Sequence, residues 1–182
     1  MIPIAYNFEP ELTASDFEKI GRLAARWAVI DHTIANCLKT QLRLSNEEAV
    51  IMVFPLQAEA RVERLKMLFK EHPPHPPAAH ALTELAPSVK GIQYVRNSVI
   101  HGIVIEDTKD GHLFHLKSKD RTVTKDQVFS TEDLTNYASH CALALRLSLG
   151  IDGYGPGTRY ELPDRPEIPK FLRSIVQWPR TP

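Results

Sequence analysis

A single long apolar stripe near the start of this chain limits the folds that the chain can adopt. Apolar side chains recur on it at steps of three and four residues: Ile20, Leu23, Trp27, Ile30, Ile34 and Leu38. This spacing is typical of an amphipathic helix with one face toward a core. Ser15 and Glu18 have capping-box spacing, and Thr13 offers an alternative cap. The pattern continues to about Leu42, so the sequence predicts an unusually long first helix.

The second helical segment opens with another capping box, formed by Ser45 and Glu48. Pro55 should kink or divide this segment, because proline removes a backbone donor and crowds the preceding turn. A further apolar face follows: Val62, Leu65, Leu68 and Phe69. We interpret the charged residues of this stretch as a solvated helix face: Glu59, Arg61, Glu63, Arg64 and Lys66. Residues 72–77 read His-Pro-Pro-His-Pro-Pro and are expected to form a stiff, extended linker.

Helix is expected to return after Pro77 and, with an interruption near Pro87, to continue to His101. Gly102 is a suitable stop, since glycine readily takes the left-handed conformation after a helix. The apolar face of this helix is formed by Val89, Ile92, Val95 and Val99. The last helix is expected to begin at Thr131 and to stop at Gly150.

Between these two helices the apolar pattern changes its period. Three short strands are expected, at 103–105, 113–116 and 122–124, with turns at 109–111 and 117–120. The sequence therefore predicts a mainly α fold. We expect one helical bundle domain over residues 1–150, with a small antiparallel β-hairpin or meander inserted at about 103–129 between the last two core helices. Residues 151–182 are rich in proline and should form an irregular tail on the body or on a partner.

The charge balance of the chain limits the partners that it can attract. Its 182 residues suit one domain, and its 22 basic residues cancel its 22 acidic residues. No global field therefore attracts nucleic acid, although a small site can still contact a few phosphates. Cys37 and Cys141 lie in helical apolar patterns and are expected to be reduced core thiols.

Neither a secretory signal nor a membrane span is predicted. The N-terminal segment lacks the basic start and apolar run of a signal peptide, and no apolar stretch is long enough to cross a bilayer. We therefore expect a cytoplasmic protein with no membrane partner. His72, His75 and His80 lack a cysteine or carboxylate that would complete a ligand set, so we expect no metal and no cofactor.

A polar row lies opposite the apolar face of the helix that ends at His101. Its members are spaced four, three and four residues apart: Lys90, Tyr94, Asn97 and His101. Arg96 lies at the edge of the apolar face. In a monomeric bundle this row would be exposed, whereas tyrosine, asparagine and histidine together also suit a site or a subunit contact. A simpler alternative is that Asn97 bonds His101 one turn later and stiffens the helix end.

Asp31 lies at the edge of the apolar stripe of the first helix. A carboxylate there needs a partner, because a buried unpaired charge is costly. Arg96, at the edge of its own stripe, is the expected partner. The contact would either orient Arg96 in a site or be a plain salt bridge between helices.

Arg96-Asn97 followed by His101-Gly102, after a long amphipathic helix and a helical hairpin, resembles the HEPN superfamily. In that group an arginine precedes a histidine by a few residues, often with a polar residue directly after the arginine. The resemblance covers roughly residues 15–149. Strands directly after His101 depart from the all-helical pattern of the superfamily, which leaves the mouth of a site, and hence its substrate, open.

The resemblance implies a helical domain that dimerises and acts as a metal-independent endoribonuclease of toxin–antitoxin, phage-defence or RNA-processing systems. His101 would be the acid and base, Arg96 the phosphate ligand and Asn97 a positioning group. The supporting residues would be Asp31, Tyr94 and Lys90. The expected partners are a second copy of the chain, an RNA substrate and an antitoxin protein.

Two other functions stay open. The same face could bind RNA or a protein without catalysis, as some members of the superfamily do. It could also seal a purely structural dimer. The neutral charge of the chain slightly favours these two functions, whereas the intact Arg96–His101 pair favours the enzyme.

Overall fold

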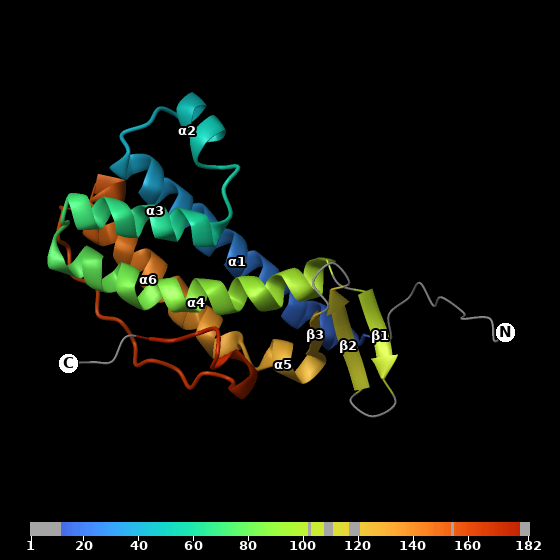
Figure 1. Cartoon of the computed structure of the whole chain (residues 1–182). Coiled ribbons are helices and arrows are strands. Elements are labelled where there is room, and N and C mark those ends of the chain that lie inside the picture. Colours follow the sequence, from blue (N-terminus) through green and yellow to red (C-terminus); the bar gives the residue numbers. More distant parts are fainter. Residues whose placement is uncertain (1–11, 102, 108–110, 117–120, 154, 179–182) are drawn as a thin grey trace.

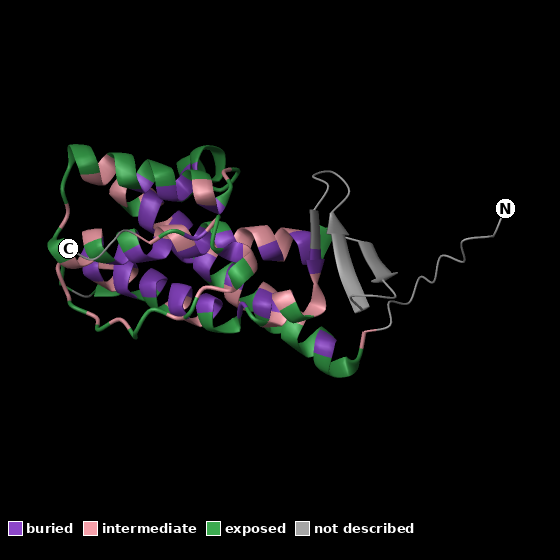
Figure 2. Cartoon of the chain, turned by 60° about the horizontal axis from the view of Figure 1, so that its bottom comes forward, coloured by how far each residue is buried: buried purple, intermediate pink, exposed green. Residues whose placement is uncertain are grey.

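The computed structural model describes residues 12–101, 103–107, 111–116, 121–153 and 155–178, with the backbone alone for the strand residues up to 122. Four long helices form the body of this described chain (Figure 1): α1 (Ala14–Gln41), α3 (Ala58–Glu71), α4 (Pro76–His101) and α6 (Glu132–Ser148). Both α1 and α4 pack against α3 and α6. Figure 2 shows the buried positions on the faces that these helices turn toward one another. The predicted mainly α class is confirmed.

The first helix keeps the predicted apolar stripe inside the bundle. Leu23, Trp27, Ile30, Ile34 and Leu38 are all buried. The cap is the alternative one: the Thr13 hydroxyl accepts from the Asp16 N–H, and the Asp16 carboxylate accepts from the Thr13 N–H. The helix therefore begins at Ala14, before the Ser15–Glu18 pair that was the other candidate.

The helix α2 (Asn46–Met52) is capped by Ser45 and Glu48, as predicted. The chain leaves the helical path before Pro55 and re-enters it at Ala58, where α3 begins. The proline therefore divides the segment rather than kinking it.

The expectations for the start and middle of α4 were wrong. The helix begins within the proposed linker, at Pro76, and it continues without interruption through Pro87. Proline is tolerated in a first turn because the N–H groups there have no partner within the helix. Pro87 has no N–H to donate to the carbonyl of Thr83, which would accept that bond in a regular helix. Thr83 is exposed, so water can hydrogen-bond to its carbonyl instead. Packing of α4 against α3 and α6 then outweighs the local preference.

Three antiparallel strands follow α4 in the order β1 (Ile103–Asp107), β2 (Gly111–Leu116) and β3 (Arg121–Thr124). The register pairs Val104 with Phe114, and Phe114 with Val123. A short helix that the sequence did not predict, α5 (Lys125–Phe129), begins directly after β3 with Thr124 and Gln127 as its capping box. The expected helix stop at Gly102 and most of the two expected turns lie outside the described residues.

The C-terminal tail lies along α4 and α6. It is mostly irregular, with two short 3-10 turns, η2 (Ile151–Gly153) and η3 (Lys170–Leu172). Leu172 and Val176 are buried, and Val176 lies so close to Gly91 of α4 that a side chain at Gly91 would meet it. The expectation that the tail lies on the body is met.

A buried carboxylate fixes the tail to the bundle. Glu84 of α4 accepts hydrogen bonds from Arg165 Nε at 2.7 Å, Arg165 Nη2 at 2.5 Å and the Tyr137 hydroxyl at 2.7 Å. The indole N–H of Trp178 donates to the Glu84 carbonyl at 3.2 Å, and its ring meets Tyr137 edge-on. The tail is therefore an integral part of the core.

Replacing Glu84 with glutamine should make the protein less sensitive to acid. The hydrogen bond from Arg165 holds the pKa of the Glu84 carboxyl below its ordinary value of 4.5. A carboxyl whose pKa is lower in the folded state than in the unfolded state stabilises the fold at pH values above its unfolded-state pKa. This stabilisation is lost as the pH falls toward the folded-state pKa. Urea unfolding from pH 7 downward should show a smaller loss in Glu84→Gln than in the wild type. Glu63→Gln, at an exposed site, should follow the wild type.

None of the helices in the described part of the chain is long and apolar enough to cross a membrane.

Candidate functional site

The last turns of α4 extend beyond the helix that covers its earlier part. Gln57, directly before α3, bonds Gln93 of α4, with Gln93 Nε2 3.1 Å from Gln57 Oε1. From this contact α4 continues to His101, which is about two turns further. Figure 1 shows α4 running past the start of α3 toward the strands. Arg96, Asn97 and His101 therefore lie where α3 no longer covers α4.

These three side chains meet in the structure. Arg96 Nη1 lies 3.0 Å from Asn97 Oδ1 and 3.2 Å from His101 Nε2. A guanidinium only donates hydrogen bonds, so Nε2 of His101 must accept one. This hydrogen bond therefore requires the tautomer of the imidazole that carries its hydrogen on Nδ1. The Nε2 lone pair of an exposed histidine is held against a cation, within reach of solvent.

Arg96 has further hydrogen-bonding capacity. Both of its bonds within the described part of the chain use Nη1. Its Nε is buried and has no hydrogen-bond partner there. Nε and Nη2 form the edge of the guanidinium that matches two oxygens of a phosphate. A buried donor without a partner destabilises the folded state. Among these three residues, Arg96 is therefore the one that would gain most from a further acceptor.

The structure places Lys90, another member of the predicted polar row, in a contact with α3 rather than in this cluster. Lys90 lies 3.9 Å from Glu59 of α3 in an exposed ion pair, which contributes little to stability. Tyr94 is half-buried against the core, and its carbonyl accepts a bond from Ser98 Oγ. The simpler alternative, a direct bond from Asn97 to His101, is not the arrangement observed, because Arg96 lies between them.

The expected Asp31–Arg96 contact was wrong. Asp31 pairs with Arg61 of α3, with Arg61 Nη1 2.5 Å from Asp31 Oδ1. Arg61 is buried, and it also donates from Nε to the Val53 carbonyl and from Nη2 to the Phe54 carbonyl. It ties the end of α2 to α1. Helical periodicity places a charge at the edge of a stripe but does not say which neighbouring helix faces it.

The position of Arg61 in the sequence did contain a signal. It lies three residues after Ala58 and four residues before Leu65, and both of these are buried. The assignment of Arg61 to a solvated face was therefore incorrect, although its charged neighbours Glu63, Arg64 and Lys66 are exposed.

Other candidate reactive groups do not form a site. Cys37 and Cys141 are free and buried, and burial raises the pKa of each thiol to about 12, which keeps them protonated at neutral pH. Among the described residues, no three histidine, cysteine, aspartate or glutamate side chains are grouped so that they could hold a metal ion.

Comparison of the chain with protein-family models, with curated proteins and with solved structures gave no match. The function of the chain is therefore inferred from its own residues, above all Arg96, Asn97 and His101.

Proposed function

We propose that the chain is a metal-independent endoribonuclease of HEPN type that works as a homodimer. The observation that supports this most strongly is the 3.2 Å contact between Arg96 Nη1 and His101 Nε2 at the end of α4, beyond the part that α3 covers. A cation with spare donors can bind the phosphate, and an imidazole can take the proton of the nucleophile, and these are two of the groups that cleavage at an RNA phosphate needs.

The reaction follows from these two groups. RNA supplies its own nucleophile. When Arg96 Nη1 turns from His101 Nε2 to the phosphate, the Nε2 lone pair is released and takes the proton of a 2′-hydroxyl, and the 2′-oxygen attacks the adjacent phosphorus. Arg96 binds the non-bridging oxygens as negative charge gathers on the phosphorane. The bond from phosphorus to the 5′-oxygen then breaks, leaving a 2′,3′-cyclic phosphate and a 5′-hydroxyl. Asn97, bonded to Arg96, holds the guanidinium in place.

The leaving 5′-oxygen needs a proton from a second acid. A second copy of the chain supplies it most simply, because a twofold axis near the end of α4 brings His101 of the partner subunit to the opposite side of the phosphate, where it donates a proton once it is released from its own arginine. Ile100, next to His101, has 43% of its surface exposed and offers an apolar contact for such an interface.

One observation favours a binding module instead. The helix α2 and the residues after it expose several apolar side chains, among them Ile51 at 77% and Phe54 at 39%. Apolar exposure of this kind suits a protein partner. RNA binding or protein binding without cleavage would support this alternative.

Replacing Arg96 with lysine should lower the rate of RNA cleavage in EDTA at least about tenfold, since lysine keeps the charge but cannot bind two phosphate oxygens in parallel. The measurement is the cleavage rate of a labelled single-stranded RNA by the purified chain. Arg64→Lys, at an exposed position of α3, should cleave at the wild-type rate. An Arg96→Lys rate equal to that of Arg64→Lys would contradict the proposed role of the guanidinium.

A further inference from the structure

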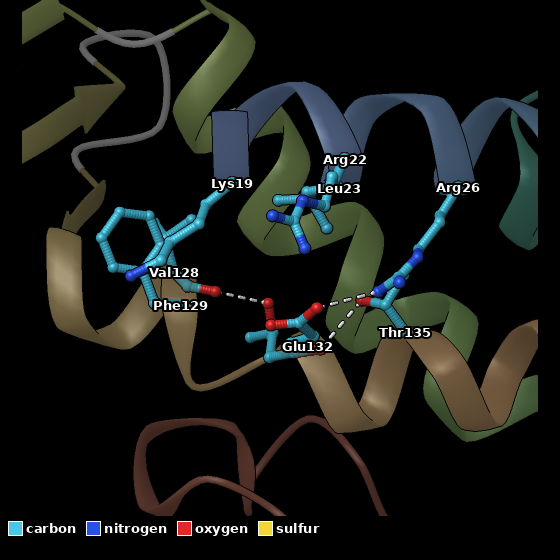
Figure 3. A pocket seen from close by; sticks show the side chains of 9 residues that line it. Lys19, Arg22, Leu23, Arg26, Val128, Phe129, Glu132 and Thr135 are labelled. Atoms are coloured by element: carbon cyan, nitrogen blue, oxygen red, sulfur yellow. Dashed lines mark hydrogen bonds and ion pairs between the residues drawn. The ribbon is translucent and has the colours of Figure 1, made fainter. Parts of the chain in front are cut away.

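A cavity of about 160 Å³ lies between the first half of α1 and the segment that joins α5 to α6. Figure 3 shows Lys19, Arg22 and Arg26 reaching from α1 toward Glu132 and Phe129 on the opposite side. The three cations recur at steps of three and four residues, so they share one face of α1. Cavities of about 150 Å³ accept a six-membered ring, so this one has room for a group of similar size.

The positive charge of this cavity is only partly balanced. Arg22 pairs with Glu18, and Arg26 Nη1 lies 3.2 Å from Glu132 Oε1. The Lys19 ammonium lies 4.3 Å from the centre of the Phe129 ring. Three cations thus face two carboxylates.

The two ion pairs are loosely held. The side chains of Arg22, Arg26 and Glu132 are 52%, 36% and 49% exposed. Pairs with this much exposure contribute little to stability, so a ligand can displace their carboxylates at small cost.

The start of α6 adds to the attraction for an anion. Thr131 precedes this helix of 17 residues and lines the cavity, but its hydroxyl donates to the Val128 carbonyl at 2.6 Å and caps no N–H of the first turn. The positive end of the helix dipole therefore lies beside the three cations without a side-chain cap, and Glu132 and Asp133 of the first turn balance part of it.

We propose that this cavity binds the phosphomonoester group of a small molecule. A phosphomonoester is nearly a dianion at neutral pH and can outcompete the single charge of Glu18 or Glu132. Its oxygens suit the forked donors of Arg22 and Arg26, and its five heavy atoms fit the cavity. Leu23 and Phe129 also line the cavity. The proposal does not depend on RNA cleavage.

Isothermal titration of the full chain at low salt tests this proposal with three probes: adenosine 5′-monophosphate, adenosine and inorganic phosphate. The nucleotide should bind and adenosine should not. Inorganic phosphate bound as tightly as the nucleotide would mean that the phosphate group alone is recognised. Tighter binding of the nucleotide would mean that the remainder of a larger ligand contributes. Both results support the proposal, whereas equal binding of adenosine and the nucleotide would overturn it.

Two substitutions should shift the affinity for the nucleotide in opposite directions. Arg22→Gln should weaken binding about fivefold or more, and Glu132→Gln should strengthen it about threefold, because a competing carboxylate is removed. Arg64→Gln on α3 should bind as the wild type does. Unchanged affinity in both Arg22→Gln and Glu132→Gln, with wild-type melting temperatures, would place the ligand elsewhere and refute the proposal.

Discussion

Replacing His101 with alanine should reduce the rate of RNA cleavage at least about a hundredfold, because a positioned general base or acid contributes roughly 10²–10⁴-fold to such reactions. The free energy of unfolding should change by less than about 1 kcal/mol. His101 is exposed at the end of α4, and its hydrogen bond to Arg96 is one that water can replace. The measurements are the cleavage rate in EDTA and urea unfolding of the same preparations.

The chain offers a closely matched control. His32 of α1 is also exposed, and it bonds a polar side chain of its own helix, with His32 Nε2 2.9 Å from Asn36 Nδ2. It lacks an arginine partner among the contacts described, so His32→Ala should cleave RNA at the wild-type rate. Equal rates for His101→Ala and the wild type would remove the basis for an enzyme. A wild-type chain that is monomeric at the assay concentration and still cleaves would exclude the second copy as the acid.

Replacing Arg61 with alanine should lower the free energy of unfolding by about 4 kcal/mol. The substitution leaves the Val53 and Phe54 carbonyls without their donor, and it leaves Asp31 without its counter-charge. A carbonyl left without its donor typically costs about 1–3 kcal/mol, and Asp31, whose side chain is 33% exposed, adds less because water can hydrate it, so about 4 kcal/mol is expected in total. Urea unfolding followed by circular dichroism measures the change.

Arg64 is the control for this substitution, because it lies on the same helix one turn later and is exposed. Its hydrogen bond to the Met52 carbonyl is long, at 3.4 Å, so Arg64→Ala should change the free energy of unfolding by less than about 0.5 kcal/mol. If Arg61→Ala were no more destabilised than Arg64→Ala, the link from α1 through Arg61 to the end of α2 would not stabilise the fold.

The local features of the fold were predictable from the sequence. The apolar stripe of α1 and the Ser45–Glu48 cap of α2 depend on residues within a few positions of one another. The continuity of α4 through Pro87 was not predictable, since it depends on packing against other helices rather than on local preference. The same holds for the tail, which Glu84 fixes through Arg165, a residue 81 positions away.

The candidate site likewise has local features that the sequence predicts and contacts between distant elements that it does not predict. Arg96, Asn97 and His101 lie within two turns of one helix, so their spacing alone indicated that they could meet. The partner of Asp31 comes from α3, and periodicity fixes the buried side of each helix without fixing which helices are neighbours. The sequence did not predict the cavity beside the cations of α1 for a related reason, because α5 and α6 complete it.

Identifying the ends of the RNA product tests the central claim most directly. The purified wild-type chain, incubated in EDTA with a short single-stranded RNA of defined sequence, should release fragments with a 2′,3′-cyclic phosphate and a 5′-hydroxyl, as mass spectrometry can show. These ends follow from attack by the 2′-oxygen, the step in which His101 and Arg96 act. Fragments with a 3′-hydroxyl and a 5′-phosphate, or intact RNA across a range of sequences, would contradict the proposed function.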